Sequence, residues 1–379
     1  MFEDITVIEL ASVLAGPATG MFFAEQGATV IKVENPFGGD ITRLWRHSVE
    51  SASSDITAYF SAINWGKKSV VLDLKSLEGR KVVYQLVETA DIVISSFLPD
   101  SARRLQLDAQ SLLRFNPQLI CAEINGYGED ENRPAYDAII QAESGFTYLN
   151  GTPGKIGKMP VALMDLLAAH QLKEAILLAL IRRMKTGKGG RVSVSLLESG
   201  ISSLANQATN WLVSGKIPQP IGSEHPNIVP YGTLFTTADQ KSLVLAVGTD
   251  SQFRALCEVL EIIPEETLQT HSGRVRNRER VRFILAEKIL GWNRDLLLEK
   301  LKEALVPAGA VNDLQEVFSL PLAQNLVLEE DIFRGLRTFV AQGIATKSLT
   351  PPPHCGQHSM EILLSLGYSE EEALALSSN

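Results

Sequence analysis

The sequence predicts an α/β fold in which helices cover both faces of a parallel sheet, together with a smaller α+β unit. Over residues 1–200, short β-branched apolar runs alternate with helical stretches, a pattern typical of a doubly wound sheet. Several of these runs are apolar throughout, as expected for strands buried on both faces. Near residue 214 the chain becomes rich in Pro and Gly, and amphipathic helices predominate beyond it, which indicates a second unit.

The first unit contains a series of candidate strands with helices between them. The strands are predicted at residues 5–11, 28–34, 69–74, 90–97, 118–126 and 191–197. The helices include residues 17–25, 77–88 and 165–184. The turn after the first strand, VLAGPATG, carries Gly16 and Gly20. This spacing matches the dinucleotide fingerprint GxGxxG poorly, so we expect no conventional NAD site there.

The second unit follows SGKIPQPIGSEHPNIVPYG, whose composition is typical of an extended linker. Its expected elements are a strand at 241–248 and helices at 251–260, 278–290 and 294–305. A last helix over 360–376 needs a core that has already formed. We therefore predict a large domain from 1–214 and 330–379, a small domain from 225–325, and linkers at 215–224 and 326–329.

Composition limits the classes of function. The net charge of −9 argues against nucleic acid or an anionic membrane surface as a partner. The cysteines Cys121, Cys257 and Cys355 are scattered and form no CxxC pair, so neither a metal site nor a disulfide framework is predicted. The opening MFEDITVIEL lacks a basic leader, and no apolar run reaches the length of a membrane span. We expect a cytoplasmic protein.

One carboxylate stands out. In VALMDLLAAH, Asp165 follows four apolar residues and precedes a long predicted helix. Asp is a favoured helix N-cap, and capping is the commoner role for such a residue. A carboxylate there would also be kept ionised by the helix N-terminus while being held out of bulk water, as a nucleophile requires. Both roles remain open from these residues alone, and both can hold at once.

Seven stretches carry a resemblance to a known family. They are LAGPATGMFFAEQGATVIKVENPFGGDITR, NWGKKSVVLDLKSLEGR, INGYGEDENRPAYDAIIQAESG, VALMDLLAAH, RRMKTGKGGRVSVSLLES, HPNIVPYGTL and PPPHCGQHS, in this order. Together they resemble the family III CoA-transferases, the formyl-CoA transferase and carnitine CoA-transferase group, over nearly the whole chain. The resemblance implies a CoA-transferase of class EC 2.8.3 with a Rossmann-like large domain. It also implies that this domain includes the C-terminal tail and that two chains form an interlocked homodimer.

The resemblance gives Asp165 a chemical role. It implies that Asp165 attacks an acyl-CoA thioester, forms a mixed anhydride and then an aspartyl-CoA thioester, and passes CoA to an acceptor carboxylate. The stretch HPNIVPYGTLFTTADQ is most similar to enzymes that move CoA between dicarboxylates. We therefore expect succinyl-CoA or another dicarboxyl-CoA as donor and a small carboxylic acid as acceptor. CoA thioester is then a substrate, and no tightly bound cofactor is expected.

The resemblance also implies a CoA site. Its positions are Leu14, Ala15, Leu72, Asp73, Leu74, Lys75, Ser96, Phe97, Leu98, Arg104 and Tyr136. Lys75 and Arg104 suit the phosphates of CoA, although either could be a solvated surface cation. Tyr136 matches a position near the thioester but could be a half-buried core residue. A CoA-contacting Arg of formyl-CoA transferase is replaced here by Asn35.

The residues that meet the distal carboxylate of the acid are less well defined. Candidates are His225, Arg43 and Arg46, and a structural loop role is slightly favoured for His225.

Two other functions are alternatives to CoA transfer. Racemases of α-methylacyl-CoA resemble this chain but carry a His before the Asp in the stretch that matches PAYDAII, because they need an acid and a base. That residue is Tyr136 here, which favours transfer. A non-catalytic CoA-binding protein would not need Asp165.

Overall fold

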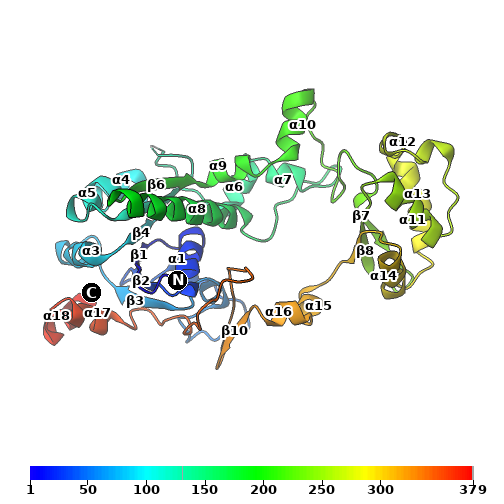
Figure 1. Ribbon diagram of the computed structural model, residues 1–379. Helices are drawn as coiled ribbons and strands as arrows, with labels where there is room; N and C mark the ends of the chain where they lie inside the picture. The colour runs from blue at the N-terminus through cyan, green and yellow to red at the C-terminus, as the bar shows by residue number, and fades with distance from the viewer. Residues whose placement is uncertain (130, 378–379) are drawn as a thin grey trace. The chain divides into compact units, whose positions relative to one another are not determined.

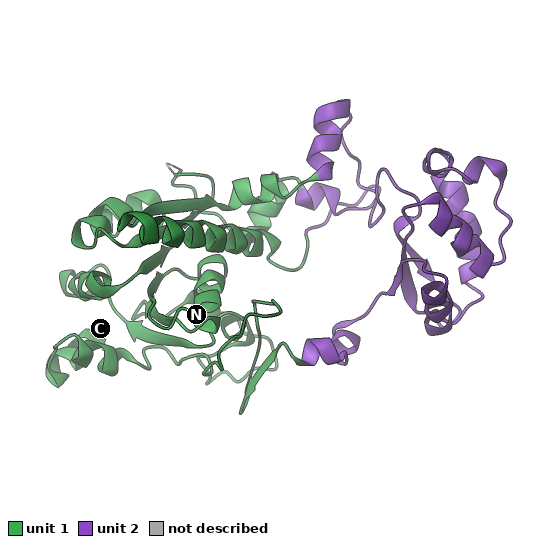
Figure 2. Ribbon diagram, in the orientation of Figure 1, with its two compact units in different colours: residues 1–145, 159–205, 325–379 green, residues 146–158, 206–324 purple. Residues whose placement is uncertain are grey.

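The computed structural model describes residues 1–129 and 131–377 (Figure 1). The chain forms two compact units, each with its own core (Figure 2). Unit 1 comprises residues 1–145, 159–205 and 325–379, and unit 2 comprises residues 146–158 and 206–324. Residues 146–158 and 206–214 group with unit 2, whereas the sequence-based boundaries place them in the large domain. Within unit 2, Gly222 N donates to Gly151 O at 2.8 Å, which links two segments that are distant in sequence.

Unit 1 is built on a six-stranded parallel sheet with the order β3-β2-β1-β4-β5-β6. The strands are β1 Thr6–Leu10, β2 Thr29–Glu34, β3 Lys67–Val71, β4 Ile92–Ser95, β5 Ile120–Asn125 and β6 Gly190–Ser195. Each overlaps a predicted strand, and the α/β class is confirmed. In this order the connections reverse direction between β1 and β4, and folds of this type bind ligands at the carboxyl ends of those strands.

Helices cover both faces of the sheet (Figure 1). On one face lie α1 Ala15–Glu25 and α8 Leu163–Thr186, which contact each other. On the other, α3 Leu77–Thr89 and α5 Ala109–Phe115 share a core with the strands and the C-terminal helices. The remaining elements of unit 1 are η1 Ile41–Leu44, α2 Ala58–Ser61, α4 Pro99–Leu105, α6 Asp137–Glu143, α9 Leu196–Ser202, β10 Val327–Glu330 and β11 Phe333–Leu336.

The prediction of a single last helix over 360–376 is wrong. The segment forms α17 Ser359–Ser365 and α18 Glu370–Ser377. Between them Gly367 has φ +92°, a conformation that ends a helix and that glycine adopts without a steric penalty. Ile362, Leu363 and Ala373 of the two helices are buried in the unit 1 core.

The chain before α17 lies along the outer edge of β3. Gly66 N donates to Thr350 O at 2.9 Å, and His358 N donates to Ser69 O at 2.9 Å. Val71 N donates to Ser359 Oγ at 3.0 Å. Residues 350–359 therefore complete the edge of a sheet whose first strand lies near the N-terminus.

Unit 2 contains a three-stranded antiparallel sheet, β7 Tyr231–Thr236, β8 Ser242–Ala246 and β9 Ala308–Ala310. Its core contains Phe253, Leu256, Val281, Leu285 and Leu297 from three of its helices. The helices of unit 2 are α7 Phe146–Leu149, α10 Asn206–Ser214, α11 Asp250–Val259, η2 Glu266–Leu268, α12 His271–Arg276, α13 Arg278–Ile289, α14 Arg294–Glu303, α15 Leu314–Phe318 and α16 Pro321–Gln324. A search of the described helices of both units finds none with the length and apolarity that a membrane crossing requires.

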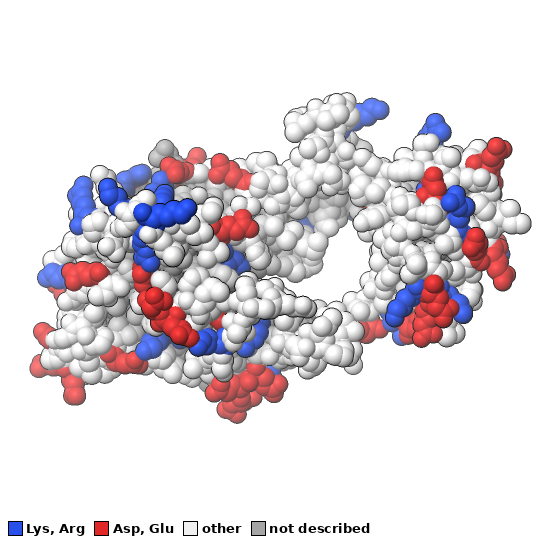
Figure 3. Space-filling model, in the orientation of Figure 1, with Lys and Arg blue, Asp and Glu red and all other residues white. Residues whose placement is uncertain are grey.

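Although the chain is acidic overall, its charge is unevenly distributed. On the face drawn in Figure 3, Lys and Arg gather on unit 1 where α4, α5 and β6 lie, while a group of acidic residues lies at the lower edge of the same unit. A basic region of this kind supplies the local cations that an anionic ligand of an acidic protein needs.

Candidate active site

Two adjoining cavities lie at the carboxyl ends of the parallel strands of unit 1. Cavity A, of about 390 Å³, is lined by Leu10, Ala11, Ser12, Lys32, Val33, Glu34, Asn35, Phe37, Gly39, Asp40, Ile41, Leu72, Asp73, Leu74, Lys75, Ser96, Phe97 and Leu105. Cavity B, of about 220 Å³, is lined by Ser12, Val13, Leu14, Ala15, Gly16, Ser96, Phe97, Leu98, Ile124, Asn125, Gly126, Arg133, Pro134, Ala135, Tyr136, Asp165 and Leu196. Ser12, Ser96 and Phe97 line both cavities, at the point between β1 and β4 where the connections reverse.

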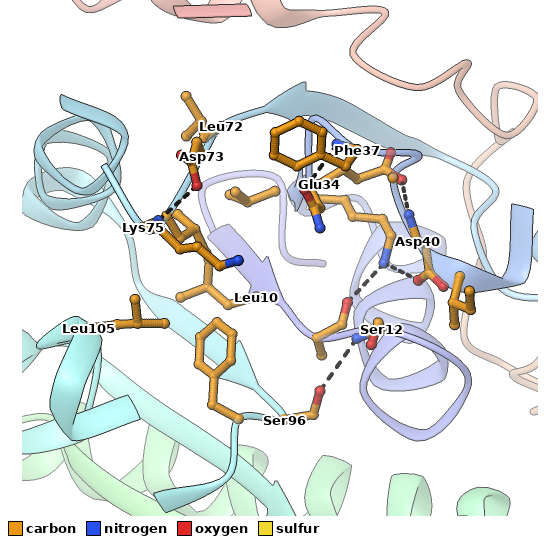
Figure 4. A pocket seen from close by; sticks show the side chains of 18 residues that line it. Leu10, Ser12, Glu34, Phe37, Asp40, Leu72, Asp73, Lys75, Ser96 and Leu105 are labelled. Atoms are coloured by element: carbon orange, nitrogen blue, oxygen red, sulfur yellow. Dashed lines mark hydrogen bonds and ion pairs between the residues drawn. The ribbon is translucent and has the colours of Figure 1, made fainter. Parts of the chain in front are cut away.

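The turn that follows β1 separates the cavities. Ser12 N donates to Ser96 Oγ at 3.4 Å, which ties this turn to the segment after β4 (Figure 4). Leu14 is the N-cap of α1, and Ala15 is its first residue. Later in α1, a Cβ atom at Gly20 would lie 2.0 Å from Glu9 Oε2, so glycine is required for the buried Glu9 carboxylate to fit. This glycine serves packing within the protein and not a dinucleotide.

Asp165 lies in the first turn of α8 and lines cavity B, with only 8% of its surface exposed. The N-cap of α8 is Ala162, so the capping interpretation of Asp165 is wrong. No hydrogen bond to the Asp165 carboxylate is found among the described residues. Its oxygens are therefore available to a molecule in cavity B.

Asp137 fulfils the capping role instead. Its Oδ1 accepts a hydrogen bond from Met164 N in the first turn of α8 at 2.8 Å. Its Oδ2 accepts one from Gln141 Nε2 at 2.7 Å, and Gln141 Oε1 accepts one from Met159 N at 2.8 Å. Asp137 was not predicted as a site residue, although it follows Tyr136 directly in PAYDAII.

The pKa of Asp165 is raised to about 7, mainly by burial of the carboxylate and in addition by the negative charge of Asp137. The position at a helix N-terminus therefore does not keep the pKa of this carboxylate near its ordinary value, because burial and the charge of Asp137 raise it. Near neutral pH a substantial fraction of Asp165 is protonated in the free protein. A weakly solvated carboxylate with a raised pKa is a stronger nucleophile once it ionises.

The segment after β3 lines cavity A as the sequence analysis expects. It supplies Leu72, Asp73, Leu74 and Lys75, and Lys75 N donates to Asp73 Oδ1 at 2.9 Å (Figure 4). The Lys75 side chain is exposed and makes no ion pair with any described residue. Asn35 lines the same cavity and its Oδ1 accepts a hydrogen bond from Phe37 N at 2.9 Å.

Two other residues predicted for the CoA site, Tyr136 and Arg104, lie in different places from each other. Tyr136 lines cavity B and is 57% exposed, so it is not a half-buried core residue. Arg104 is exposed on α4 and lines neither cavity, although its neighbour Leu105 lines cavity A. The Arg104 guanidinium donates to Ser101 Oγ at 3.4 Å.

Arg43, a candidate for binding the distal carboxylate of the acid, makes its contacts within the protein instead. It is 1% exposed, donates to Glu34 through Nε at 2.8 Å and through Nη2 at 2.6 Å, and lies 3.7 Å above the Phe60 ring centroid. Arg46 is exposed and donates to Ser54 O at 2.6 Å. Arg43 therefore holds the fold and is not free to meet a substrate.

His225 belongs to unit 2. Its Nδ1 accepts a hydrogen bond from Asn227 N at 3.1 Å, and its ring packs edge-on against Tyr231 at 5.4 Å. These contacts support the structural loop role.

Cavity B also contains a cation that the sequence analysis missed. Arg133 stacks on the Tyr127 ring at 4.4 Å and donates to Glu143 Oε1 at 2.5 Å. The only signal in the sequence was its position three residues before Tyr136. A search of the described residues for three or more His, Cys, Asp or Glu side chains able to hold a metal ion finds no such group.

Comparison with known proteins identifies the family of the chain. The family model described as CoA-transferase family III matches residues 2–359. The chain is 40% identical to the succinate–glutarate CoA-transferase of Agrobacterium fabrum, over 98% of this chain and 97% of the relative. It is 31% identical to the succinyl-CoA:glutarate CoA-transferase of Homo sapiens, over 95% of this chain and 85% of the relative. A crystal structure of a CAIB/BAIF family protein from Brucella suis matches with a TM-score of 0.85 and 37% identity, covering 96% of this chain and 98% of that chain.

Proposed function

The chain belongs to CoA-transferase family III, and we propose that it moves CoA from a dicarboxyl-CoA, such as succinyl-CoA, to a carboxylic acid acceptor through covalent intermediates on Asp165. The observation that carries this proposal is the placement of Asp165. It is a buried carboxylate without a described hydrogen-bond partner, and it shares cavity B with the segments after β1 and β4. The names of the two relatives support dicarboxylates as the substrate class.

The proposed reaction starts with the ionised Asp165. One carboxylate oxygen attacks the thioester carbonyl carbon of the donor, the C–S bond breaks, and a mixed anhydride and CoA thiolate form. The thiolate then attacks the Asp165 carbonyl carbon, which releases the donor as a free carboxylate and leaves an aspartyl-CoA thioester. The energy of the thioester is thereby retained on the enzyme.

The acceptor reverses these steps. Its carboxylate attacks the aspartyl-CoA carbonyl and expels the thiolate, giving a second mixed anhydride. The thiolate attacks the acceptor side of this anhydride, which yields the new acyl-CoA and regenerates the Asp165 carboxylate. No proton is consumed over the cycle, so no general base is needed. Water must be kept away, because it would hydrolyse the anhydrides, and the 8% exposure of Asp165 serves this purpose.

For CoA we propose that cavity B holds the thioester end and that cavity A holds more distant parts of the molecule. The free Lys75 ammonium at cavity A suits a phosphate group. Arg104 lies outside both cavities, so we propose that it meets a phosphate at the protein surface. Tyr136 would lie beside the reacting groups in cavity B.

A matrix of acyl-CoA donors and free acids tests the function. Purified protein is incubated with each donor and each acid, and acyl-CoA products are measured by mass spectrometry. We expect transfer from succinyl-CoA to dicarboxylic acids, and little to monocarboxylic acids of the same length. Epimerisation of a branched acyl-CoA, with no acid accepting CoA, would instead support the racemase alternative.

A further inference from the structure

The turn between β1 and α1, residues 11–13, has a strained backbone at Val13. This residue has φ +71°, in the left-handed region that β-branched side chains disfavour strongly. The turn lines both cavities and leads directly into Leu14 and Ala15. Such a conformation persists only when the surrounding structure imposes it.

Two buried charged residues hold the turn on either side of Ser12. Val13 N lies 3.3 Å from each carboxylate oxygen of Asp40 and donates to them. Lys32 Nζ donates to Ala11 O at 2.9 Å. Lys32 and Asp40 are paired at 2.9 Å, so one ion pair fixes both an amide and a carbonyl of the same turn.

The ion pair is itself held in place. Asp40 also accepts hydrogen bonds from Thr42 N at 3.0 Å and Thr42 Oγ1 at 2.9 Å, and Lys32 pairs with Glu9 at 3.0 Å. Lys32 and Asp40 are 1% and 4% exposed. Taking two charges out of water is costly, so a buried pair is a weak source of stability. What this pair does provide is a defined position for the backbone of the turn.

We propose that Asp40, held by Lys32, is a positioning residue for CoA transfer, because it keeps Val13 in the left-handed conformation that aligns Leu14 and Ala15 with Asp165 in cavity B. This inference rests on the proposed role of Asp165. Asp40 does not act on the substrate itself, and its effect on the reaction passes through the turn.

The test combines the loss of Asp40 with two substitutions of Val13. Asp40→Ala removes the acceptor for Val13 N, and we expect kcat for CoA transfer to fall tenfold or more. Val13→Gly added to Asp40→Ala should restore most of this loss, because glycine adopts a positive φ without a steric penalty. Val13→Ala in the same background should restore little, because alanine removes the same methyl groups but keeps the Cβ that disfavours this φ. A role of Asp40 that is merely structural would not distinguish glycine from alanine at residue 13.

Asp40→Asn provides the background in case Asp40→Ala does not fold, since Asn keeps the size of the side chain but loses one of the two acceptors for Val13 N and the charge that Lys32 pairs with. The same order of rescue, glycine above alanine, is expected there. Equal effects of the two Val13 substitutions, or wild-type kcat in both Asp40 variants, would overturn the inference.

Urea unfolding of the same variants separates this inference from the proposed function. If Asp40 holds Val13, removing Asp40 destabilises the Val13→Ala protein more than the Val13→Gly protein, whether or not the protein transfers CoA. Wild-type protein with no transferase activity, together with this difference in stability, would contradict the proposed function but leave the coupling of the two residues intact. Equal destabilisation in both would overturn the coupling itself.

Discussion

Asp137 accepts a 2.8 Å hydrogen bond from the backbone amide of Met164, the residue that precedes Asp165 in α8. The negative charge that caps this helix therefore lies beside the buried carboxylate to which we assign the chemistry. Burial, and in addition the charge of Asp137, raise the pKa of Asp165, so the residue that fixes the helix start also contributes to the raised pKa.

This contact predicts how the rate of CoA transfer depends on pH. Because the reactive form of Asp165 is the carboxylate and its pKa is about 7, kcat/KM of the wild type should rise with pH through neutrality. Asp137→Asn removes the nearby charge, so the rising limb should move to lower pH. Asp108→Asn is the matched control, since Asp108 caps α5 through Ser111 N at 3.1 Å. If kcat/KM of Asp137→Asn rises over the same pH range as that of the wild type, the role given to Asp137 is contradicted.

Asp165→Asn should reduce turnover roughly a thousandfold or more, because an amide cannot attack the thioester. Treating the wild type with acyl-CoA and then hydroxylamine should leave a hydroxamate on the peptide that contains MPVALMDLLAAH, whereas the variant should stay unlabelled. Mass spectrometry of the variant checks that the amide has not hydrolysed back to Asp. A label on a different carboxylate would show that the nucleophile lies elsewhere.

The same substitution should stabilise the fold at neutral pH. The pKa of Asp165 rises from the ordinary 3.8 to about 7 on folding, so the folded protein binds this proton more tightly than the unfolded chain over that window. The wild type therefore loses stability as pH rises through the window, and Asn does not. Urea unfolding at about pH 4 and about pH 8 should show the advantage of Asp165→Asn growing with pH. An advantage that is constant with pH would mean that Asp165 is ionised as easily in the fold as in water.

Arg104→Ala should weaken acyl-CoA binding about tenfold by removing a charged contact to phosphate. Arg103→Ala is the control on the same helix, where Arg103 pairs with Asp100 at 2.6 Å. Calorimetry with both variants measures their dissociation constants for acyl-CoA. Equal losses of affinity would indicate a general effect of charge, and no loss in Arg104→Ala would remove Arg104 from the CoA site.

We propose that the protein is an interlocked homodimer, as the family resemblance implies. Exposed apolar side chains support a large interface, among them Leu178 and Met184 of α8 at 68% and 86% exposure. Leu212 and Val213 of α10 are 69% and 88% exposed. Chains threaded through each other cannot separate without unfolding, so tagged and untagged dimers mixed under native conditions should not exchange subunits. Rapid appearance of mixed dimers by native mass spectrometry would exclude interlocking.

The strands of unit 1 were predictable because their signal is local. The run TVIKV in β2 is β-branched at every position except Lys32, and the parallel order follows from the helices between the strands. Residues 72–75 and 96–98 were placed at the CoA site by the resemblance, and their segments line the two cavities.

The parts of the site that escaped prediction depend on contacts between distant residues. Asp137 caps a helix that begins at Leu163, and no local pattern links the two. Val13 has a positive φ that valine disfavours, and we attribute this conformation to the hydrogen bond from Val13 N to Asp40. The raised pKa of Asp165 depends on burial, which a sequence shows only indirectly.

The C-terminal segment that completes the edge of β3 has a consequence for synthesis of the chain. The Ser69 hydroxyl accepts a hydrogen bond from Gly356 N at 2.8 Å and donates one to Glu34 Oε1 at 2.6 Å. Gly356 emerges from the ribosome only after the whole of unit 2 has been translated. At the usual 5–20 residues per second, the nascent sheet waits roughly 8 to 30 s between the end of α9 and the arrival of residue 359. During that interval the outer edge of β3 lacks these partners, and an unpaired strand edge can pair with another chain.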